Sequence, residues 1–464
     1  MKAEDRIWDF VVVGAGIAGL AIAELFSRSK LRVALLEKNP KICQEASGAH
    51  HSWFHFGSLY SIFTNNQFMR TLLGGIDDLL AYYSQFPTMN IRVSADGKLE
   101  FPQGPAMWIC DEPIEYIVSA RNDPDFNLRK FDGAKDYLKK LFFLATWEFA
   151  IKQFISRHQR FHKYDWRSGQ ASQWVPQAGW LDYSREVISK PTNTNILLDV
   201  DTHFRISGFD RPMNATAIIS DLLRSFFATG GSLFVQQTVV NFESTKGNYT
   251  KVVTDKGEFR ARKVILAAGK WLEQFVGKSL KLKVVASPLL VVHPPVCRSH
   301  FVRLTPFVDK SVNHLLHAVN GLNYSLIGGG YFADPNDPEA VKRVERELVL
   351  TAERVFPHIA DSQIKQTYIG YKTEVTANRG ERNYQYFIRG IDENISVVTP
   401  AKFSLAFSLA VNAYKRLVGG EPCIHVKYGG NIDVSEYVGM MRHAEIVANA
   451  IQAKKDALLV SVLD

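Results

Sequence analysis

The chain has 464 residues, of which 46% are hydrophobic and 22% are charged, and its formal net charge is +8. This much apolar material excludes a disordered chain and is enough to bury the cores of two or three structural units. The positive charge comes with no recognised nucleic-acid-binding motif, so we expect no nucleic acid partner. It favours an anionic substrate or a membrane surface, and a solvated basic face is the alternative.

The sequence carries no targeting signal that we recognise. Residues 1–7 are charged and lead directly into a strand pattern, unlike a signal peptide. The longest apolar run, residues 284–293, is too short to span a bilayer and contains a proline. The cysteines are far apart in the sequence and form no CxxC pair. We therefore expect free thiols, a cytoplasmic location and no metal site.

The first predicted element is a buried strand at residues 9–13, which read Asp-Phe-Val-Val-Val. A complete GxGxxG motif follows at once and consists of Gly14, Ala15, Gly16, Ile17, Ala18 and Gly19. Helical spacing then covers residues 20–29, and a second strand is predicted at residues 31–37. This order of strand, glycine turn, helix and strand predicts a Rossmann-type dinucleotide site, and a purely structural glycine turn is the alternative.

Each part of this motif has a mechanical role. Gly14 permits the tight turn out of the strand, Gly16 lets the backbone approach a pyrophosphate, and Gly19 lets the helix pack closely on the sheet. The helix N-terminus offers unpaired N–H groups and a partial positive charge to the phosphates. The second strand ends at Glu37, at the spacing where a carboxylate accepts hydrogen bonds from ribose hydroxyls.

Three later segments, together with the opening unit, resemble the D-amino-acid-oxidase superfamily of FAD-dependent oxidoreductases. Residues 45–60 read Glu-Ala-Ser-Gly-Ala-His-His-Ser-Trp-Phe-His-Phe-Gly-Ser-Leu-Tyr and are similar to its small-residue loop and His-x-Gly pattern. Residues 230–242 and 264–269 are similar to its adenine-side strand and its strand-ending Ala-Ala-Gly. Residues 394–410 resemble the C-terminal turn and helix of 2-hydroxyglutarate dehydrogenases, within the branch that also holds glycerol-3-phosphate dehydrogenases. The resemblance implies FAD as the cofactor.

The resemblance also implies further FAD contacts and shows two departures. The contacts are expected from Lys38, Ser47, Val239, Ala268, Gly269, Thr399 and Pro400. His50, His51 and Ser52 stand where the hydroxyglutarate-type loop has Asn-Ser-Gly, and Ala401 and Lys402 make the C-terminal turn less rich in glycine. Some members attach FAD covalently through a histidine of this loop. For His50 and His51 that interpretation stands beside ordinary loop residues near the pyrophosphate.

We expect an α/β fold with a Rossmann-type FAD-binding domain and an interleaved antiparallel-sheet α+β substrate domain. The FAD-binding domain is predicted from residues 1–75, 190–280 and 395–450, and the substrate domain from residues 76–189 and 281–394. Strands of the substrate sheet are predicted at 315–319, 324–328 and 386–388. A helical insertion at 135–162 carries an apolar stripe that favours packing on the protein's own core, and its basic residues leave a peripheral membrane contact open.

The resemblance places His55 on the substrate side of the flavin, where a neutral imidazole accepts an alcohol proton near pH 7. The alternative is a histidine that only hydrogen-bonds the flavin or the backbone. Residues 370–374 resemble a Gly-Ile-Arg-Ala-Gln segment, with Lys372 in place of the arginine. Lys372 and Arg382 are therefore candidates to bind a substrate anion, and exposed surface charge is the alternative for each.

The predicted activity is the oxidation of a small anionic 2-hydroxy acid or a related alcohol, by hydride transfer to flavin N5. Two other functions remain open. One is an FAD-dependent amine or amino-acid oxidase, and the other is a flavin-dependent biosynthetic tailoring enzyme or a protein that binds FAD structurally. The electron acceptor is oxygen, a quinone or a carrier protein, and the sequence does not choose among them.

Overall fold

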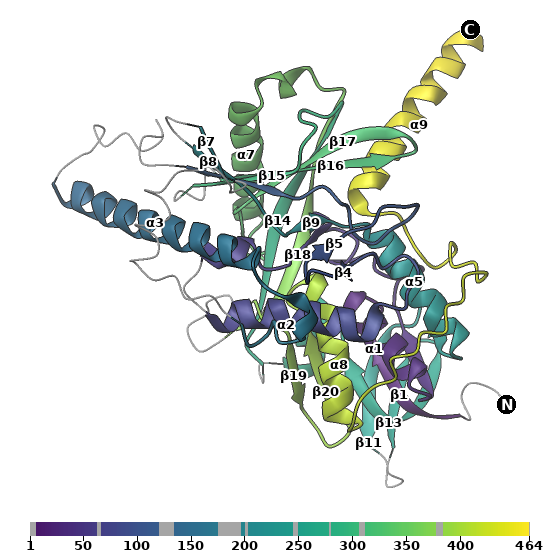
Figure 1. Cartoon of the computed structure of the whole chain (residues 1–464). Coiled ribbons are helices and arrows are strands. Elements are labelled where there is room, and N and C mark those ends of the chain that lie inside the picture. The colour runs from purple at the N-terminus through teal and green to yellow at the C-terminus, as the bar shows by residue number, and fades with distance from the viewer. Residues whose placement is uncertain are drawn as a thin grey trace.

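The structure is a computed structural model that describes residues 6–62, 66–119, 134–174, 196–199, 203–244, 249–277, 280–305, 311–376 and 384–463. Two large sheets form its centre, and helices pack around them (Figure 1). Two short antiparallel pairs complete the described strands, β3 (Trp53–Phe54) with β9 (Arg211–Pro212) and β4 (Arg92–Val93) with β5 (Leu99–Glu100). Single turns of 3₁₀ helix are η2 (Leu59–Ile62), η4 (Trp166–Ser168), η5 (Gly269–Leu272), η8 (Pro357–Asp361) and η9 (Phe403–Leu405).

The first sheet joins segments from distant parts of the chain. Its order is β10 (Ser232–Phe234), β2 (Val33–Leu36), β1 (Ile7–Val13), β13 (Gly257–Leu266), β12 (Thr250–Thr254) and β11 (Val239–Ser244). β20 (Ile395–Thr399) also pairs with β13, and β19 (Phe387–Gly390) pairs with β20. The pairs among β10, β2, β1, β13 and β20 are parallel, so the predicted Rossmann-type unit is confirmed.

One large core covers a face of this sheet. It is built from α1 (Ile17–Arg28), α2 (Asn66–Tyr83), α5 (Ala215–Ala228) and α8 (Ala406–Leu417). Every residue of α1 is buried, including Glu24 and Arg28, whose side chains form an ion pair at 2.9 Å. Because four helices from distant parts of the sequence share this core, the first sheet and its helices hold one another in place. The short α6 (Glu273–Val276) contributes Val276 to the core on the sheet's other face.

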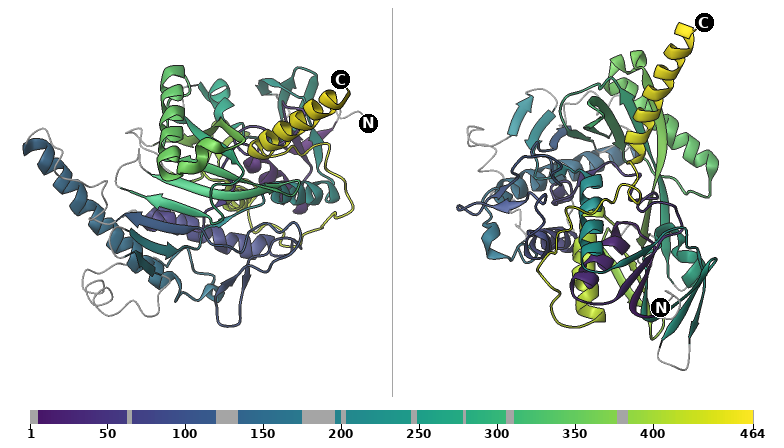
Figure 2. Two further views of the ribbon diagram at one scale, coloured as in Figure 1. Left: turned by 90° about the horizontal axis from the view of Figure 1, so that it is seen from above. Right: turned by 90° about the vertical axis from the view of Figure 1, so that its right-hand side faces the viewer.

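The second sheet has the order β18 (Ile364–Val375), β14 (Leu282–His293), β17 (Leu322–Gly329), β16 (Val312–Val319), β15 (Phe301–Leu304), β6 (Glu115–Ser119), β8 (His203–Ser207) and β7 (Ile196–Asp199). Its described pairs are antiparallel except β15 with β6. α7 (Pro338–Val355) and α9 (Arg442–Leu463) pack on it through separate cores. α3 (Ala134–Phe161) packs on it through its C-terminal half and extends away from the body (Figures 1 and 2).

The predicted strands at 315–319 and 324–328 are confirmed as the hairpin of β16 and β17, and the long helix as α3. The predicted strand at 386–388 is confirmed as β19, but its sheet is wrong, because β19 pairs with β20 in the first sheet. Residues 391–394 connect β19 to β20, and because this connection is short, the two strands pair directly with each other. β7 and β8 fall in the range 190–280 but pair in the second sheet, and the domain boundaries stay a prediction. No helix of the described residues is both long and apolar enough to cross a membrane.

Two buried histidines predict how stability depends on pH. His158 and His314 are at most 1% exposed, and burial lowers the pKa of each to about 4. Since this lies below the ordinary value near 6.5, the unfolded chain binds more protons than the folded one between these limits. Their stabilising contribution is therefore complete above about pH 6.5 and is lost as pH falls toward about 4. We expect the urea midpoint to fall over this window.

The matched variant is His314→Gln, which removes one titrating ring while leaving polar atoms for Ser299 and Ser325, its present partners. It should weaken the pH dependence by about 1.4 kcal/mol per pH unit inside the window. A slope equal to that of the unaltered protein would contradict this assignment.

Candidate active site

A cavity of about 570 Å³ is lined by residues from both large sheets. This volume lies within the range of cofactor and ligand pockets. Its floor is formed where β1, β2 and β13 end, which is where ligands bind in parallel α/β sheets. Its opposite walls come from β16, β17 and β18 and from the turn before α8.

The glycine turn is closely packed against the neighbouring strand end. Gly14 has a φ of 98°, and a Cβ atom there would lie 2.8 Å from the Ala267 carbonyl oxygen. A Cβ atom on Gly19 would lie 1.9 Å from the Gly14 carbonyl oxygen. A Cβ atom on Gly16 would lie 3.2 Å from Ser47 Oγ, which accepts a hydrogen bond of 2.9 Å from the Ile17 N–H. Side chains are therefore excluded at positions 14 and 19, and Gly14 and Gly16 line the cavity without a side chain.

Glu37 is buried at the end of β2 and lines the cavity. Its carboxylate accepts hydrogen bonds of 2.9 Å from the Ala15 and Asn39 N–H groups. Burial raises the pKa of this carboxyl, while the two backbone donors oppose that shift. A carboxylate has about four acceptor positions, so capacity remains for two hydroxyl donors.

An ion cluster lies beside the same end of the cavity. Glu45 contacts Lys38 Nζ at 3.2 Å and Lys270 Nζ at 2.9 Å. Burial acts to raise the pKa of Glu45, but hydrogen bonds and charges from the two lysines hold it below its ordinary value. The lysines also lie over aromatic rings, Lys38 at 3.7 Å from the Trp271 centroid and Lys270 at 4.1 Å from that of Tyr371. The positive charge at this end is thus partly balanced within the protein.

The predicted cofactor residues mostly come together here. Those that line the cavity are Gly14, Gly16, Ile17, Ala18, Glu37, Lys38, Ser47, Val239, Ala268, Gly269 and Pro400. Ala15, Gly19 and Thr399 do not line it. Ala15 instead holds Glu37 through its N–H, Gly19 packs on the turn, and Thr399 is buried at the end of β20. Their roles as FAD contacts stay predictions.

His55 lies at the other end of the cavity, just after β3. Its ring stacks at a tilt of 33° on Trp53, with 4.5 Å between the centroids. Desolvation lowers the pKa of His55 to about 4, although Asp210 acts in the opposite direction. The imidazole is therefore neutral near pH 7, as an acceptor of a substrate proton must be.

Asp210 is a functional candidate that the sequence did not indicate. Its side chain is completely buried, and its Oδ2 lies 3.6 Å from His55 Nδ1. This separation is longer than a hydrogen bond, yet a buried carboxylate there favours the tautomer with the proton on Nδ1. Burial raises the pKa of Asp210, and interactions with His55, Tyr116 and the Phe56 N–H lower it overall. His55 is thereby left with Nε2 as its acceptor atom.

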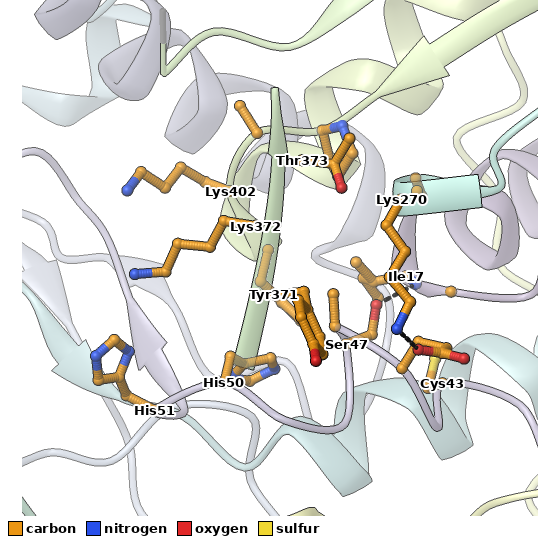
Figure 3. Close-up of a pocket in the computed structure, with 18 of the residues that line it drawn as sticks. Ile17, Cys43, Ser47, His50, His51, Lys270, Tyr371, Lys372, Thr373 and Lys402 are labelled. Carbon is orange, nitrogen blue, oxygen red and sulfur yellow. Dashed lines mark hydrogen bonds and ion pairs between the residues drawn. The ribbon is translucent and has the colours of Figure 1, made fainter. Parts of the chain in front are cut away.

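Two lysines reach into the cavity from different elements. Lys372 extends from β18 and Lys402 from the turn before α8, in the same direction and on the side where His51 lies (Figure 3). Lys372 Nζ lies 4.6 Å from the Phe332 ring centroid, and Lys402 Nζ lies 4.9 Å from that of Tyr60. Both charges act to lower the pKa of His55, behind the larger effect of burial.

Lys402 was noticed in the sequence only as a departure from a glycine-rich turn. The structure shows why it enters the cavity, because Ala401 adopts a left-handed φ of 55° and turns the chain. The acidic residues among the described cavity-lining residues are Glu37 and Glu45, both at the nucleotide end. The end with Lys372 and Lys402 therefore attracts anions. Arg382, the other predicted anion-binding residue, lies outside the described residues.

α9 supports the loop of residues 50–55, which carries His50, His51 and His55. His443 Nδ1 lies 2.6 Å from the Tyr324 hydroxyl, and its Nε2 lies 3.2 Å from Ser52 Oγ. Ser52 has a left-handed φ of 58°, a conformation that favours glycine, so this hydrogen bond supports a strained residue. His317 stacks on His443 and approaches the His51 carbonyl oxygen at 3.3 Å. These contacts fix the path of residues 50–55.

His50 and His51 both line the cavity as neutral rings. Burial lowers the pKa of His50 to about 3 and that of His51 well below its ordinary value. His50 Nδ1 accepts a hydrogen bond of 2.8 Å from the Ser52 N–H, so its proton is on Nε2. His51 Nε2 lies over Gly328, where a Cβ atom would approach it to 2.9 Å. Neutral rings that line the cavity suit either interpretation of this pair, and the covalent attachment stays a prediction.

A parallel sheet, a glycine turn at a helix N-terminus and a ribose-type carboxylate define a dinucleotide-binding enzyme whose cavity extends to a second sheet. The family model described as FAD dependent oxidoreductase (DAO) matches residues 9–188 and 206–399. The chain belongs to this family, so it is an FAD-dependent oxidoreductase and FAD is its cofactor. The comparison with curated proteins gives no match.

Solved structures with the same fold include three of different printed activity. L-alpha-glycerophosphate oxidase from Mycoplasma pneumoniae, with FAD bound, has 16% identity, a TM-score of 0.58 and coverage of 92% of this chain and 98% of its own. Glycine oxidase from Geobacillus kaustophilus has 16% identity, a TM-score of 0.54 and coverage of 93% and 98%. L-proline dehydrogenase from P. horikoshii has 13% identity, a TM-score of 0.56 and coverage of 90% and 94%. At these identities the likeness concerns the fold.

Two glycines provide a sharp test of the cofactor site. Gly14→Ala places a methyl group against the Ala267 carbonyl, and we expect FAD affinity to fall at least about tenfold because the turn must open. Fluorescence titration of the apoprotein with FAD measures this.

The control is Gly230→Ala, which has a similar φ of 88° but no atom within 4 Å of the added methyl group. It should cost some stability and leave FAD affinity unchanged. Equal losses of affinity in the two variants would show that backbone strain, and not the close approach at residue 14, explains the effect.

Proposed function

We propose that this protein oxidises a small anionic 2-hydroxy acid or a related alcohol. The observation that carries the proposal is the meeting of two ammonium groups, Lys372 and Lys402, with a neutral histidine backed by a buried carboxylate at one end of the cavity. Bound FAD supplies the hydride acceptor, flavin N5. The remaining chemistry falls to the chain's own residues.

His55 accepts the proton of the substrate hydroxyl at Nε2. Its lowered pKa keeps it neutral before the reaction, and the carboxylate of Asp210 stabilises the charge that it then gains. Lys372 and Lys402 bind the substrate's anionic group and so orient its C–H bond. The neighbouring Trp53 and Tyr60 rings restrict water near His55, which strengthens these interactions.

A hydroxyl fits this end of the cavity better than a substrate ammonium. A substrate ammonium at this end would be repelled by two lysines, because the carboxylates of the described lining residues lie at the nucleotide end. An amine or amino-acid oxidase is therefore our second candidate, and the similar structures include both a glycerophosphate oxidase and a glycine oxidase. The free state of the four cysteines supports the cytoplasmic location that we propose.

Anaerobic flavin reduction tests the substrate class. We expect 2-hydroxy acids or anionic alcohols to bleach the flavin absorbance near roughly 450 nm. Bleaching by amines alone, with a rate that rises with pH, would overturn the proposal in favour of the second candidate. Reduction by neither class would favour a tailoring role or a structural flavin.

Lys402→Gln tests anion binding. Loss of one charged hydrogen-bond donor costs about 1.5–3 kcal/mol, so we expect KM to rise roughly 10- to 100-fold while FAD stays bound. Lys415→Gln is the control, since Lys415 pairs with Glu421 on the surface and should leave KM unchanged. An unchanged KM in Lys402→Gln would exclude this lysine from substrate binding.

Asp210→Asn tests the orientation of His55. We expect flavin reduction to slow about tenfold or more with KM little changed, because the carboxylate no longer stabilises the protonated ring. The control is Tyr116→Phe, which removes another donor to Asp210 at 2.7 Å and leaves His55 in place. If both variants slow the reaction equally, Asp210 acts only through the fold.

A further inference from the structure

The outer end of α3 exposes apolar side chains to solvent. Phe142 is 74% exposed and Leu138 is 64% exposed, which makes them the two most exposed large apolar side chains among the described residues. They stand four positions apart, on one face of the helix. Figures 1 and 2 show this end of α3 extending away from the body of the protein.

The inner half of α3 is sufficient to anchor the helix. Ile151, Phe154 and Ile155 are buried at 5% exposure or less, in a core with β6 and β15. Of the predicted apolar stripe, Phe154 packs in this core as expected, whereas Ile151 and Ile155 lie outside that stripe. The predicted packing is wrong for Leu138 and Phe142, which are exposed.

Leu138 and Phe142 have further apolar residues beside them on the helix. Ala145 is exposed and Leu141 is partly buried, and both lie within one turn of Leu138 or Phe142 on the same side of the helix. The same turns of sequence contain three lysines against one carboxylate, Lys135, Lys139, Lys140 and Asp136. Exposed apolar side chains in a segment rich in lysine are typical of segments that bind the interface of an anionic membrane.

We propose that the outer part of α3, residues 134–146, docks onto an anionic lipid surface, with Leu138 and Phe142 inserted among the acyl chains. Charge favours this occupant, because an anionic bilayer attracts a segment with three lysines and one carboxylate, whereas a second copy brings the same positive segment and opposes docking. The docking is peripheral. Trp147, on the next turn, lines the cavity and donates a hydrogen bond of 3.0 Å to the Ser119 carbonyl oxygen, so the docked segment adjoins the active site.

Co-sedimentation of the FAD-loaded protein with vesicles tests this proposal. Vesicles of phosphatidylglycerol and phosphatidylcholine should bind the protein, and phosphatidylcholine alone should bind it at least tenfold more weakly. The double variant Leu138→Ser/Phe142→Ser should lose at least tenfold in affinity for the anionic vesicles. Leu350→Ser is the control, because Leu350 is 51% exposed on a different helix, α7, and should bind like the unaltered protein.

Lys139→Glu/Lys140→Glu separates charge from insertion, and should weaken binding to anionic vesicles without changing the flavin spectrum. Equal binding by the serine double variant and the unaltered protein would overturn the proposal, as would failure of the unaltered protein to bind either vesicle. If light scattering instead shows that the serine double variant converts a dimer to a monomer, the face binds a second copy and the lipid assignment is wrong. The flavin spectrum and substrate reduction in solution are read separately, so failure here leaves the proposed function intact.

Discussion

The buried carboxylate of Asp210 holds the substrate end of the site together. It accepts hydrogen bonds from the Phe56 and Ser58 N–H groups at 2.7 and 3.2 Å, and from the Tyr116 hydroxyl at 2.7 Å. These partners come from the loop after β3 and from β6, so one side chain links that loop to the second sheet. A buried carboxylate without partners is very costly, so the arrangement forms as a unit. The position of His55 follows from it.

The cavity separates its charges along its length. At the nucleotide end Glu45 pairs with two lysines and Glu37 is held by backbone donors, so the protein partly balances its own charge. At the other end Lys372 and Lys402 lie among aromatic rings and neutral histidines. In the proposed reaction the first end holds the hydroxyl-rich adenosine part of FAD, and the second end holds the anionic group of the substrate.

The sequence correctly predicted the features that are determined by residues close together in the chain. The opening strand, glycine turn and helix, Glu37 at the end of β2 and the long α3 are each determined by neighbours in sequence. Asp210 and His443 were missed because their partners are distant along the chain and no local pattern marks them. β19 was assigned to the wrong sheet, because a short apolar run in the sequence does not indicate which strand it pairs with.

The first sheet has a consequence for the order of events during synthesis. β1 and β2 near the N-terminus are completed by β10 and β13 in the middle of the chain and by β20 near residue 399. The cavity walls likewise run from Val13 to Phe403. Residues up to about Phe403 must therefore leave the ribosome before the cavity is complete. FAD can therefore bind its complete site only late in synthesis, after the distant parts of the chain have come together.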